Sequence, residues 1–140
     1  MADYTSKTVR IRRSAEQIYN LFSDFTQLSA VIPKDKLEDF EATENECSFT
    51  AKPLGRTGIA IVARETNSYV KYGPNGSKPF DFFFWIQMKE VAPYDTRIRL
   101  TLRAELNFMM KTMIGKKLQK GLDQFAEQLA AVLNGQTPPA

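Results

Sequence analysis

The sequence of 140 residues predicts an α+β domain in which an antiparallel sheet packs against one long C-terminal helix. Three observations support this prediction. Six segments suited to strands follow one another between residues 38 and 106, separated by turn residues. The last of them alternates apolar and polar side chains cleanly, as expected for a sheet with one wet and one buried face. Apolar side chains then recur at helical spacing over residues 108–133.

The N-terminal part predicts one strand and two short helices. We expect the strand at residues 7–12. Ser14 followed by Gln17 is a capping-box pattern, which opens a helix with apolar residues at helical spacing. A second short helix is expected at residues 25–32, because Pro33 disfavours helical geometry in the residue before it.

The central part predicts six strands that make up most of a sheet of about seven. Their expected ranges are residues 38–43, 47–52, 59–65, 67–72, 80–89 and 95–106. The segment GPNGSKP, residues 73–79, is rich in residues that tolerate positive φ and therefore predicts a hairpin loop.

The final helix is expected at about residues 108–133, with Asn107 as its N-cap and a length of roughly 39 Å. Gly135 ends it. We therefore expect one domain over residues 1–134 and a disordered tail over residues 135–140. The apolar stripe of this helix is predicted to comprise Met110, Ile114, Leu118, Leu122, Phe125, Leu129 and Val132.

The composition disfavours several classes of protein. Histidine is absent, which removes the commonest near-neutral acid/base and the commonest zinc ligand, so no metal or cofactor is expected. Cys47 is the single cysteine and has no intrachain disulfide partner, which suggests a reducing cytoplasm. No apolar run approaches the ~20 residues of a transmembrane helix, and the N-terminus does not resemble a signal peptide.

The order of elements resembles the helix-grip fold of the SRPBCC superfamily. This superfamily includes START-type lipid carriers, the birch pollen allergen family and polyketide cyclases. The resemblance covers residues 7–134 and is carried by SAEQIYNLFSDFTQLSAVIP and GKKLQKGLDQFAEQLAAVL. It implies a curved sheet wrapped around the long helix, with a cavity between them for an apolar small molecule. No shared catalytic motif can be placed on this sequence.

Strand and helix parity then select the side chains that face the interior. They belong either to such a cavity or to an ordinary core. Tyr72 is the best inward polar group to orient a ligand, and Tyr19 is a second candidate. Gly115 and Gly121 either permit close packing of the helix on the sheet or make room at the cavity mouth. The predicted ligand-binding residues are Phe49, Ile61, Tyr72, Phe82, Phe84, Ile86, Leu100, Leu102, Met110, Met113, Ile114 and Leu118.

These observations favour binding of an apolar or amphipathic small molecule, such as a lipid, quinone, sterol or polyketide-like compound. One alternative is an enzyme of the polyketide cyclase/dehydratase type. Such an enzyme needs a pocket acid or base with a tuned pKa. The sequence offers no inward-facing pair of carboxylates, and Asp24, Glu65 and Tyr72 are only loose candidates. We therefore do not expect an enzyme.

A second alternative is an RNA- or ribosome-associated or protein-interaction module, because the net charge is +3 and the pI about 9.0. The long helix carries a group of lysines, and a membrane-surface role would use the same side chains. A solvated helix face is the usual explanation, and no aromatic residues interleave with them to stack bases. Nucleic-acid binding is therefore not expected. The lysines are Lys111, Lys116, Lys117 and Lys120.

The stretch PFDFFFWIQ, residues 79–87, places Phe83 and Trp85 on the outer face of the sheet. In the first interpretation arginines of the next strand cover them. Matching opposite charges across the two strands sets Asp81 against Arg103 and Trp85 against Arg99, with a five-residue loop at residues 90–94. In the second interpretation the aromatic pair forms a homodimer contact.

Overall fold

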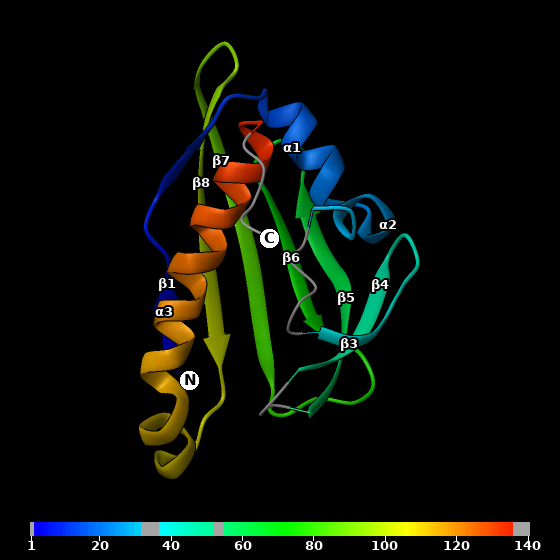
Figure 1. The fold of residues 1–140 in the computed structure, drawn as a ribbon, viewed down its shortest axis with the longest axis vertical. Helices are drawn as coiled ribbons and strands as arrows, with labels where there is room; N and C mark the ends of the chain where they lie inside the picture. The colour runs from blue at the N-terminus through cyan, green and yellow to red at the C-terminus, as the bar shows by residue number, and fades with distance from the viewer. Residues whose placement is uncertain (1, 32–36, 52–54, 136–140) are drawn as a thin grey trace.

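The computed structural model describes residues 2–31, 37–51 and 55–135. Within them the strands form one antiparallel sheet in the order β1-β8-β7-β6-β5-β4-β3, and β2 pairs with β8 further along its length. Figure 1 shows α3, drawn orange to red, lying across one face of this sheet. The elements are β1 (Ala2–Thr5), β2 (Val9–Ile11), α1 (Ala15–Phe22), α2 (Phe25–Leu28), β3 (Leu37–Ala42), β4 (Glu46–Ala51), β5 (Gly55–Glu65), β6 (Tyr69–Pro74), β7 (Phe82–Ala92), β8 (Asp95–Ala104) and α3 (Phe108–Leu133).

The predicted fold class is confirmed, although several strand bounds differ and β5 begins at Gly55 instead of residue 59. β1, a strand of only four residues that pairs with the end of β8, was not predicted. The second helix ends at Leu28, because Ser29 to Val31 continue as turns rather than as α-helix. The rest of that predicted helix and residues 136–140 of the predicted tail lie outside the described residues.

Both predicted helix caps are present. The Ser14 hydroxyl accepts a hydrogen bond from the amide of Gln17 at 3.1 Å, and the Gln17 side chain accepts one from the amide of Ser14 at 3.0 Å. Asn107 caps α3 in the same sense, since its side-chain oxygen accepts from the amide of Met110 at 2.8 Å. These bonds satisfy amide groups that have no partner within the helix.

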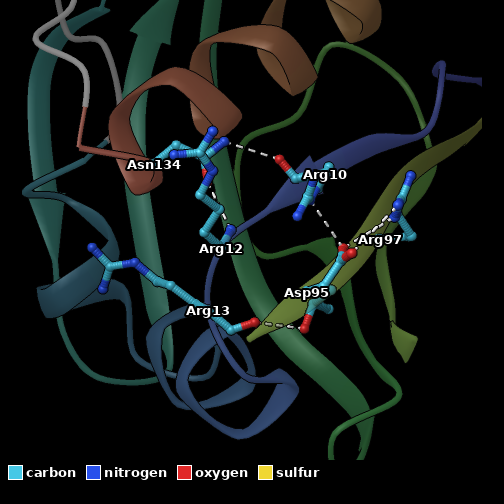
Figure 2. Close-up of polar contacts among 7 residues, drawn as sticks. Arg10, Arg12, Arg13, Asp95, Arg97 and Asn134 are labelled. Carbon is cyan, nitrogen blue, oxygen red and sulfur yellow. Dashed lines mark hydrogen bonds and ion pairs between the residues drawn. The ribbon is translucent and has the colours of Figure 1, made fainter. Parts of the chain in front are cut away.

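The C-terminal end of α3 is anchored to the segment between β2 and α1. The Asn134 side chain accepts from the amide of Arg12 at 2.7 Å and donates to the carbonyl of Arg10 at 3.0 Å. The Arg13 guanidinium also donates to the carbonyl of Leu133 at 3.0 Å, and a cation is favourable at a helix C-terminus. Figure 2 shows Asn134 between Arg10 and Arg12. This junction sets where α3 crosses the sheet.

The predicted register between β7 and β8 is wrong by two residues. Lys89 lies opposite Arg97, and Ala92 lies opposite Asp95 across a two-residue turn in which Tyr94 has a φ of 57°. A bulge between residues 90 and 92 accompanies this turn. A shift of two residues leaves every side chain on the same face, so the apolar pattern cannot choose between the two registers.

Asp95 offsets the like charges that this register brings together. Its carboxylate lies 3.2 Å from the Arg97 guanidinium and 3.4 Å from that of Arg10. Figure 2 shows Asp95 between these two arginines. Arg97 therefore has an acidic partner at the end of its own strand, and Lys89 is exposed to solvent. The register of β7 and β8 therefore follows the tight turn and not the cross-strand charge pairing on which the prediction relied.

The core fills the space between the sheet, α1 and the C-terminal half of α3. The buried stripe of α3 is Gly115, Leu122, Ala126, Leu129 and Leu133, which shares only Leu122 and Leu129 with the predicted stripe. The helix is thus rotated relative to the prediction. On its buried side Gly115 packs closely on β1, since an added Cβ would lie 3.0 Å from the Tyr4 hydroxyl oxygen.

Candidate ligand-binding cavity

A cavity of about 450 Å³ lies between strands β3–β7, helix α2 and the C-terminal half of α3. It is partly open to solvent and falls in the usual size range of small-molecule sites, about 300–1,000 Å³. The lining residues are Phe25, Leu28, Leu37, Phe40, Cys47, Phe49, Ile59, Tyr72, Phe84, Ile86, Gly121, Gln124, Phe125 and Gln128. Among these described residues none carries a formal charge at neutral pH.

Aromatic contacts connect the walls of the cavity. The Tyr72 ring centre lies 5.3 Å from that of Phe25 and 6.0 Å from that of Phe84, both in tilted arrangements. Phe40 stacks on Phe49 with ring centres 6.3 Å apart. Such pairs contribute about 0.5–1.5 kcal/mol beyond their buried area. The aromatic walls are therefore held by contacts between neighbouring elements and do not depend on a ligand for support.

Tyr72 is the most deeply buried polar group of the lining, with 2% of its surface exposed. Its hydroxyl donates a 2.5 Å hydrogen bond to the carbonyl oxygen of Phe22. Burial, and then the proximity of Cys47, raise the pKa of Tyr72 well above its ordinary value. The hydroxyl proton is thus already used in a hydrogen bond within the protein. Towards a ligand Tyr72 offers its ring and an oxygen lone pair, but no free donor.

Cys47 also faces the cavity and is 6% exposed. Burial raises the pKa of its thiol from 9.0 to about 11. The neutral thiol therefore dominates at physiological pH, and a neutral thiol is a poor nucleophile and metal ligand. Cys47 is thus a small buried side chain of the cavity wall rather than a reactive thiol.

The helix side of the cavity is formed by Gly121, Gln124, Phe125 and Gln128, which recur at positions i, i+3, i+4 and i+7. Gly121, Gln124 and Gln128 are exposed, so they lie at the cavity mouth. A Cβ added at Gly121 would meet no atom within 4 Å, so this glycine leaves open space there. Gly115 and Gly121 thus differ, the first permitting close packing and the second making room.

Four of the twelve predicted ligand-binding residues line the cavity, namely Phe49, Tyr72, Phe84 and Ile86. The other eight do not. Phe82 and Leu100 are buried elsewhere, and Ile61 and Leu102 are half-buried against the core. On α3, Met110, Ile114 and Leu118 are half-buried outside the cavity, and Met113 is 66% exposed. The N-terminal half of α3 packs on the β1–β8 side of the sheet, away from the cavity.

The sequence analysis also missed part of the lining. Phe25 and Leu28 come from α2. The alternation of side chains along the strands and the helical spacing in α3 do not predict which side chains of so short a helix face the cavity. Gln124 and Gln128 are polar and were therefore left out of an apolar stripe. Their spacing around Phe125, which was in the predicted stripe, was the available signal.

Of the three acid/base candidates from the sequence, Asp24 and Glu65 lie outside the lining. Asp24 is the N-cap of α2 and accepts from the amide of Thr26 at 2.9 Å, and its hydrogen bonds to Thr26 lower the pKa of its carboxyl. Glu65 is exposed at the end of β5. The described residues hold no group of three or more side chains suited to a metal ion. None of the described helices is long and apolar enough to cross a membrane.

On the outer face of the sheet, Phe83 and Trp85 are half-buried and lie 6.2 Å apart. Lys71 of β6 covers both rings, with its Nζ atom 4.3 Å from the centre of Phe83 and 5.1 Å from that of Trp85. The guanidinium of Arg103 lies 5.8 Å from the Trp85 ring. Cations therefore cover the aromatic pair, but the first interpretation is only partly confirmed, because Lys71 of β6 covers both rings and Arg103 is the one arginine of β8 near them among the described residues.

The predicted partner of Trp85 is nevertheless wrong. Arg99 lies opposite Gln87 and donates to its side-chain oxygen at 3.2 Å, because of the two-residue shift in register. Trp85 lies opposite Thr101 instead. The homodimer contact through the aromatic pair stays a prediction.

Comparison with known proteins supports the fold. The chain is similar to the Aha1 dimer from Colwellia psychrerythraea, with 16% identity over 99% of this chain and 100% of that chain and a TM-score of 0.75. It is similar to truncated norcoclaurine synthase from Thalictrum flavum, with 11% identity over 97% and 96% and a TM-score of 0.71. It is also similar to a START superfamily protein from Mycobacterium smegmatis, with 18% identity over 95% and 94% and a TM-score of 0.62.

No protein-family model and no curated protein sequence matches the chain. Sequence identities as low as those to the three solved structures establish a shared fold but no shared activity. The order of elements, the single antiparallel sheet and the long C-terminal helix agree with those structures. The chain therefore has the START-like helix-grip fold.

Proposed function

We propose that this protein binds a neutral, apolar or amphipathic small molecule in the cavity between the sheet and α3. The observation that carries this proposal is a cavity of about 450 Å³ whose described lining holds apolar side chains and no formal charge. An ionised ligand buried there would lose hydration without gaining a charged partner. Burying about 300 Å² of apolar ligand surface contributes roughly 7 kcal/mol before association costs.

The lining also suggests how a ligand is oriented. The buried part of the lining carries the side chains of Phe25, Tyr72 and Ile86, whereas the mouth carries the exposed amides of Gln124 and Gln128. Amide groups both donate and accept hydrogen bonds. The ligand best suited to this arrangement has an apolar body that enters first and a carbonyl or hydroxyl group that stays at the mouth.

Native mass spectrometry after incubation with a long-chain fatty alcohol, a quinone and a sterol tests the proposal. We expect one of these probes to be retained at one molecule per chain. Gly121→Phe places a ring in the open space at the mouth and should weaken retention at least tenfold. Thr112→Phe, at an exposed position outside the cavity on the same helix, is the matched control. Retention of no probe, or equal retention by Gly121→Phe, contradicts the proposal.

The cyclase/dehydratase alternative gains no support from the cavity. Its two titratable lining groups, Cys47 and Tyr72, both have raised pKa values, and the Tyr72 proton is held by Phe22. General acid–base catalysis near neutral pH favours a group whose pKa lies near the working pH. Passive binding is therefore the function that we propose.

A further inference from the structure

The first turns of α3 expose apolar side chains that nothing in the described structure covers. Phe108 is 87% exposed, Met109 69% and Met113 66%, which makes them the three most exposed large apolar side chains of the described residues. Their exposure does not come from fraying at the helix start, because Asn107 caps the helix at the amide of Met110. Burial of Gly115 and Leu122 against the domain orients the opposite side of α3, which carries Met109 and Met113, towards solvent.

The same stretch of the helix carries a concentrated positive charge. Between residues 108 and 122 the sequence has four lysines and no acidic residue. All four are exposed, and none takes part in an ion pair within the described part of the chain. The four are Lys111, Lys116, Lys117 and Lys120.

Helical geometry brings the two kinds of side chain together. Met109, Met113, Lys116 and Lys120 stand at positions i, i+4, i+7 and i+11, which share one side of a helix. The first turn holds no acidic residue, so the positive end of the helix dipole adds to the lysines. Apolar tips beside flexible cations are the pattern of helices that lie at a membrane interface, where lysine stems extend along the apolar boundary.

Two other occupants fit this surface less well. A second copy docked through the same face would bring Lys116, Lys117 and Lys120 against the same three lysines, and like charges oppose such a contact. Single-stranded RNA would meet the lysines, but stacking of successive bases needs several aromatic platforms, and this surface offers only Phe108 beside two methionines. We propose that the first turns of α3 bind an anionic membrane surface, with Phe108, Met109 and Met113 entering the interface and the lysines contacting lipid headgroups.

This contact is separate from the cavity. The cavity-lining residues of α3 begin at Gly121, and the exposed apolar group ends at Met113. Binding to vesicles is therefore expected whether or not the cavity holds a ligand. Failure of the ligand test leaves this proposal standing, and failure of the vesicle test leaves the cavity proposal standing.

Flotation with vesicles tests the proposal in the full chain. We expect binding to phosphatidylcholine vesicles that contain about one-third phosphatidylglycerol and no binding to pure phosphatidylcholine. Each lysine near an anionic surface contributes about fivefold in affinity, so replacing Lys116, Lys117 and Lys120 by Gln should weaken binding by about 100-fold. Raising the salt from about 50 to about 500 mM should also release the wild type. Arg12→Gln with Lys89→Gln and Arg99→Gln removes the same charge elsewhere and should bind nearly as the wild type.

A second pair of variants tests insertion of the apolar tips. Met109→Ser with Met113→Ser should weaken binding at least tenfold, whereas Val62→Ser with Val91→Ser, at exposed positions on β5 and β7, should not. Met109→Trp in a Trp85→Phe background should show a blue-shifted emission on vesicles, quenched by brominated lipid. Circular dichroism of each variant checks that it is folded.

The proposal is overturned if anionic vesicles bind no protein at low salt. It is also overturned if the methionine variant binds as the wild type, since the contact is then electrostatic only. Binding to single-stranded RNA without binding to vesicles assigns the surface to the other class of partner. Loss of vesicle binding in both the lysine and the methionine variants, with retention in both controls, supports it.

Discussion

The Tyr72 hydroxyl donates a hydrogen bond to the carbonyl oxygen of Phe22, fifty residues earlier in the chain and at the last residue of α1. This bond joins a strand that walls the cavity to the helix beside it. It also explains why a tyrosine stands at a position where neighbouring inward residues are purely apolar. The Tyr72 hydroxyl therefore stabilises the contact between β6 and α1, and the ring lines the cavity.

Tyr72→Phe should therefore destabilise the protein and leave the cavity nearly unchanged in shape. The carbonyl of Phe22 would lose its partner in a buried environment, which costs about 1–3 kcal/mol. The free energy of unfolding from urea titration measures this loss. Tyr19→Phe, at a half-buried position, is the control and should change stability by less than about 0.5 kcal/mol. Equal stability of Tyr72→Phe and the wild type contradicts the role given to this bond.

Alkaline pH should weaken the fold through the same residue. The pKa of Tyr72 is raised in the folded protein, so its contribution is complete below its ordinary value of 10.0 and is lost as the pH rises above it. Cys47 acts in the same direction from pH 9.0 towards about 11. In a Cys47→Ala background, the free energy of unfolding should fall as the pH rises above 10 when Tyr72 is present, and should fall less in Tyr72→Phe. A parallel fall in both proteins would refute the assignment to Tyr72.

Cys47 should react slowly with iodoacetamide and even more slowly when the cavity is filled. A thiol with a pKa of about 11 instead of 9.0 has roughly 100-fold less thiolate at pH 8. Mass spectrometry of the modified fraction over time measures the rate, with the urea-unfolded protein as the reference. Modification of the folded protein at the unfolded rate would show that the thiol is neither buried nor shifted in its pKa.

The two glycines of α3 should respond differently to alanine. Gly121→Ala should stabilise the protein by up to about 1 kcal/mol, because the added Cβ meets no neighbour and alanine favours the helix. Gly115→Ala should gain less or lose stability, because its Cβ would lie 3.0 Å from the Tyr4 hydroxyl oxygen. Thermal unfolding of both variants checks the order. In Tyr4→Ala, the difference between the two substitutions should disappear.

Removing the cation over the outer aromatic pair should cost a small amount of stability. Lys71→Gln is expected to lose about 0.5–1 kcal/mol, whereas Lys89→Gln, which makes no such contact in the described residues, should not. Light scattering of Trp85→Ser tests the dimer interpretation separately. A change from dimer to monomer would assign the contact to this face, and an unchanged mass would assign any dimer elsewhere.

Strand parity was the part of the site that sequence could predict. Val70, Tyr72 and Ile86 face the interior as expected, because a one-residue error would move every side chain of a strand to the wrong face. The turn between β7 and β8 was not predictable in this way. Registers that differ by two residues share the same parity, and the local conformation at Tyr94 decides between them.

The helix side of the cavity was harder to predict for a different reason. The buried side of α3 includes Gly115, which packs against Tyr4 of the four-residue strand β1, and a glycine does not count towards an apolar stripe. No local pattern in α3 contains that information. Gln124 and Gln128 at the mouth were also hard to predict, because in sequence a polar residue at a cavity rim cannot be told from any other solvent-facing residue.

The junction of Asn134 with Arg10 and Arg12 joins positions more than 120 residues apart. During synthesis, β2 has no strand to pair with until β8 has left the ribosome, and the helix end cannot dock until residue 134 has followed. The β3–β7 hairpins can form earlier, with one face of their sheet still uncovered. Folding of this domain is thus completed late, and the exposed sheet is the state that chaperones would have to protect.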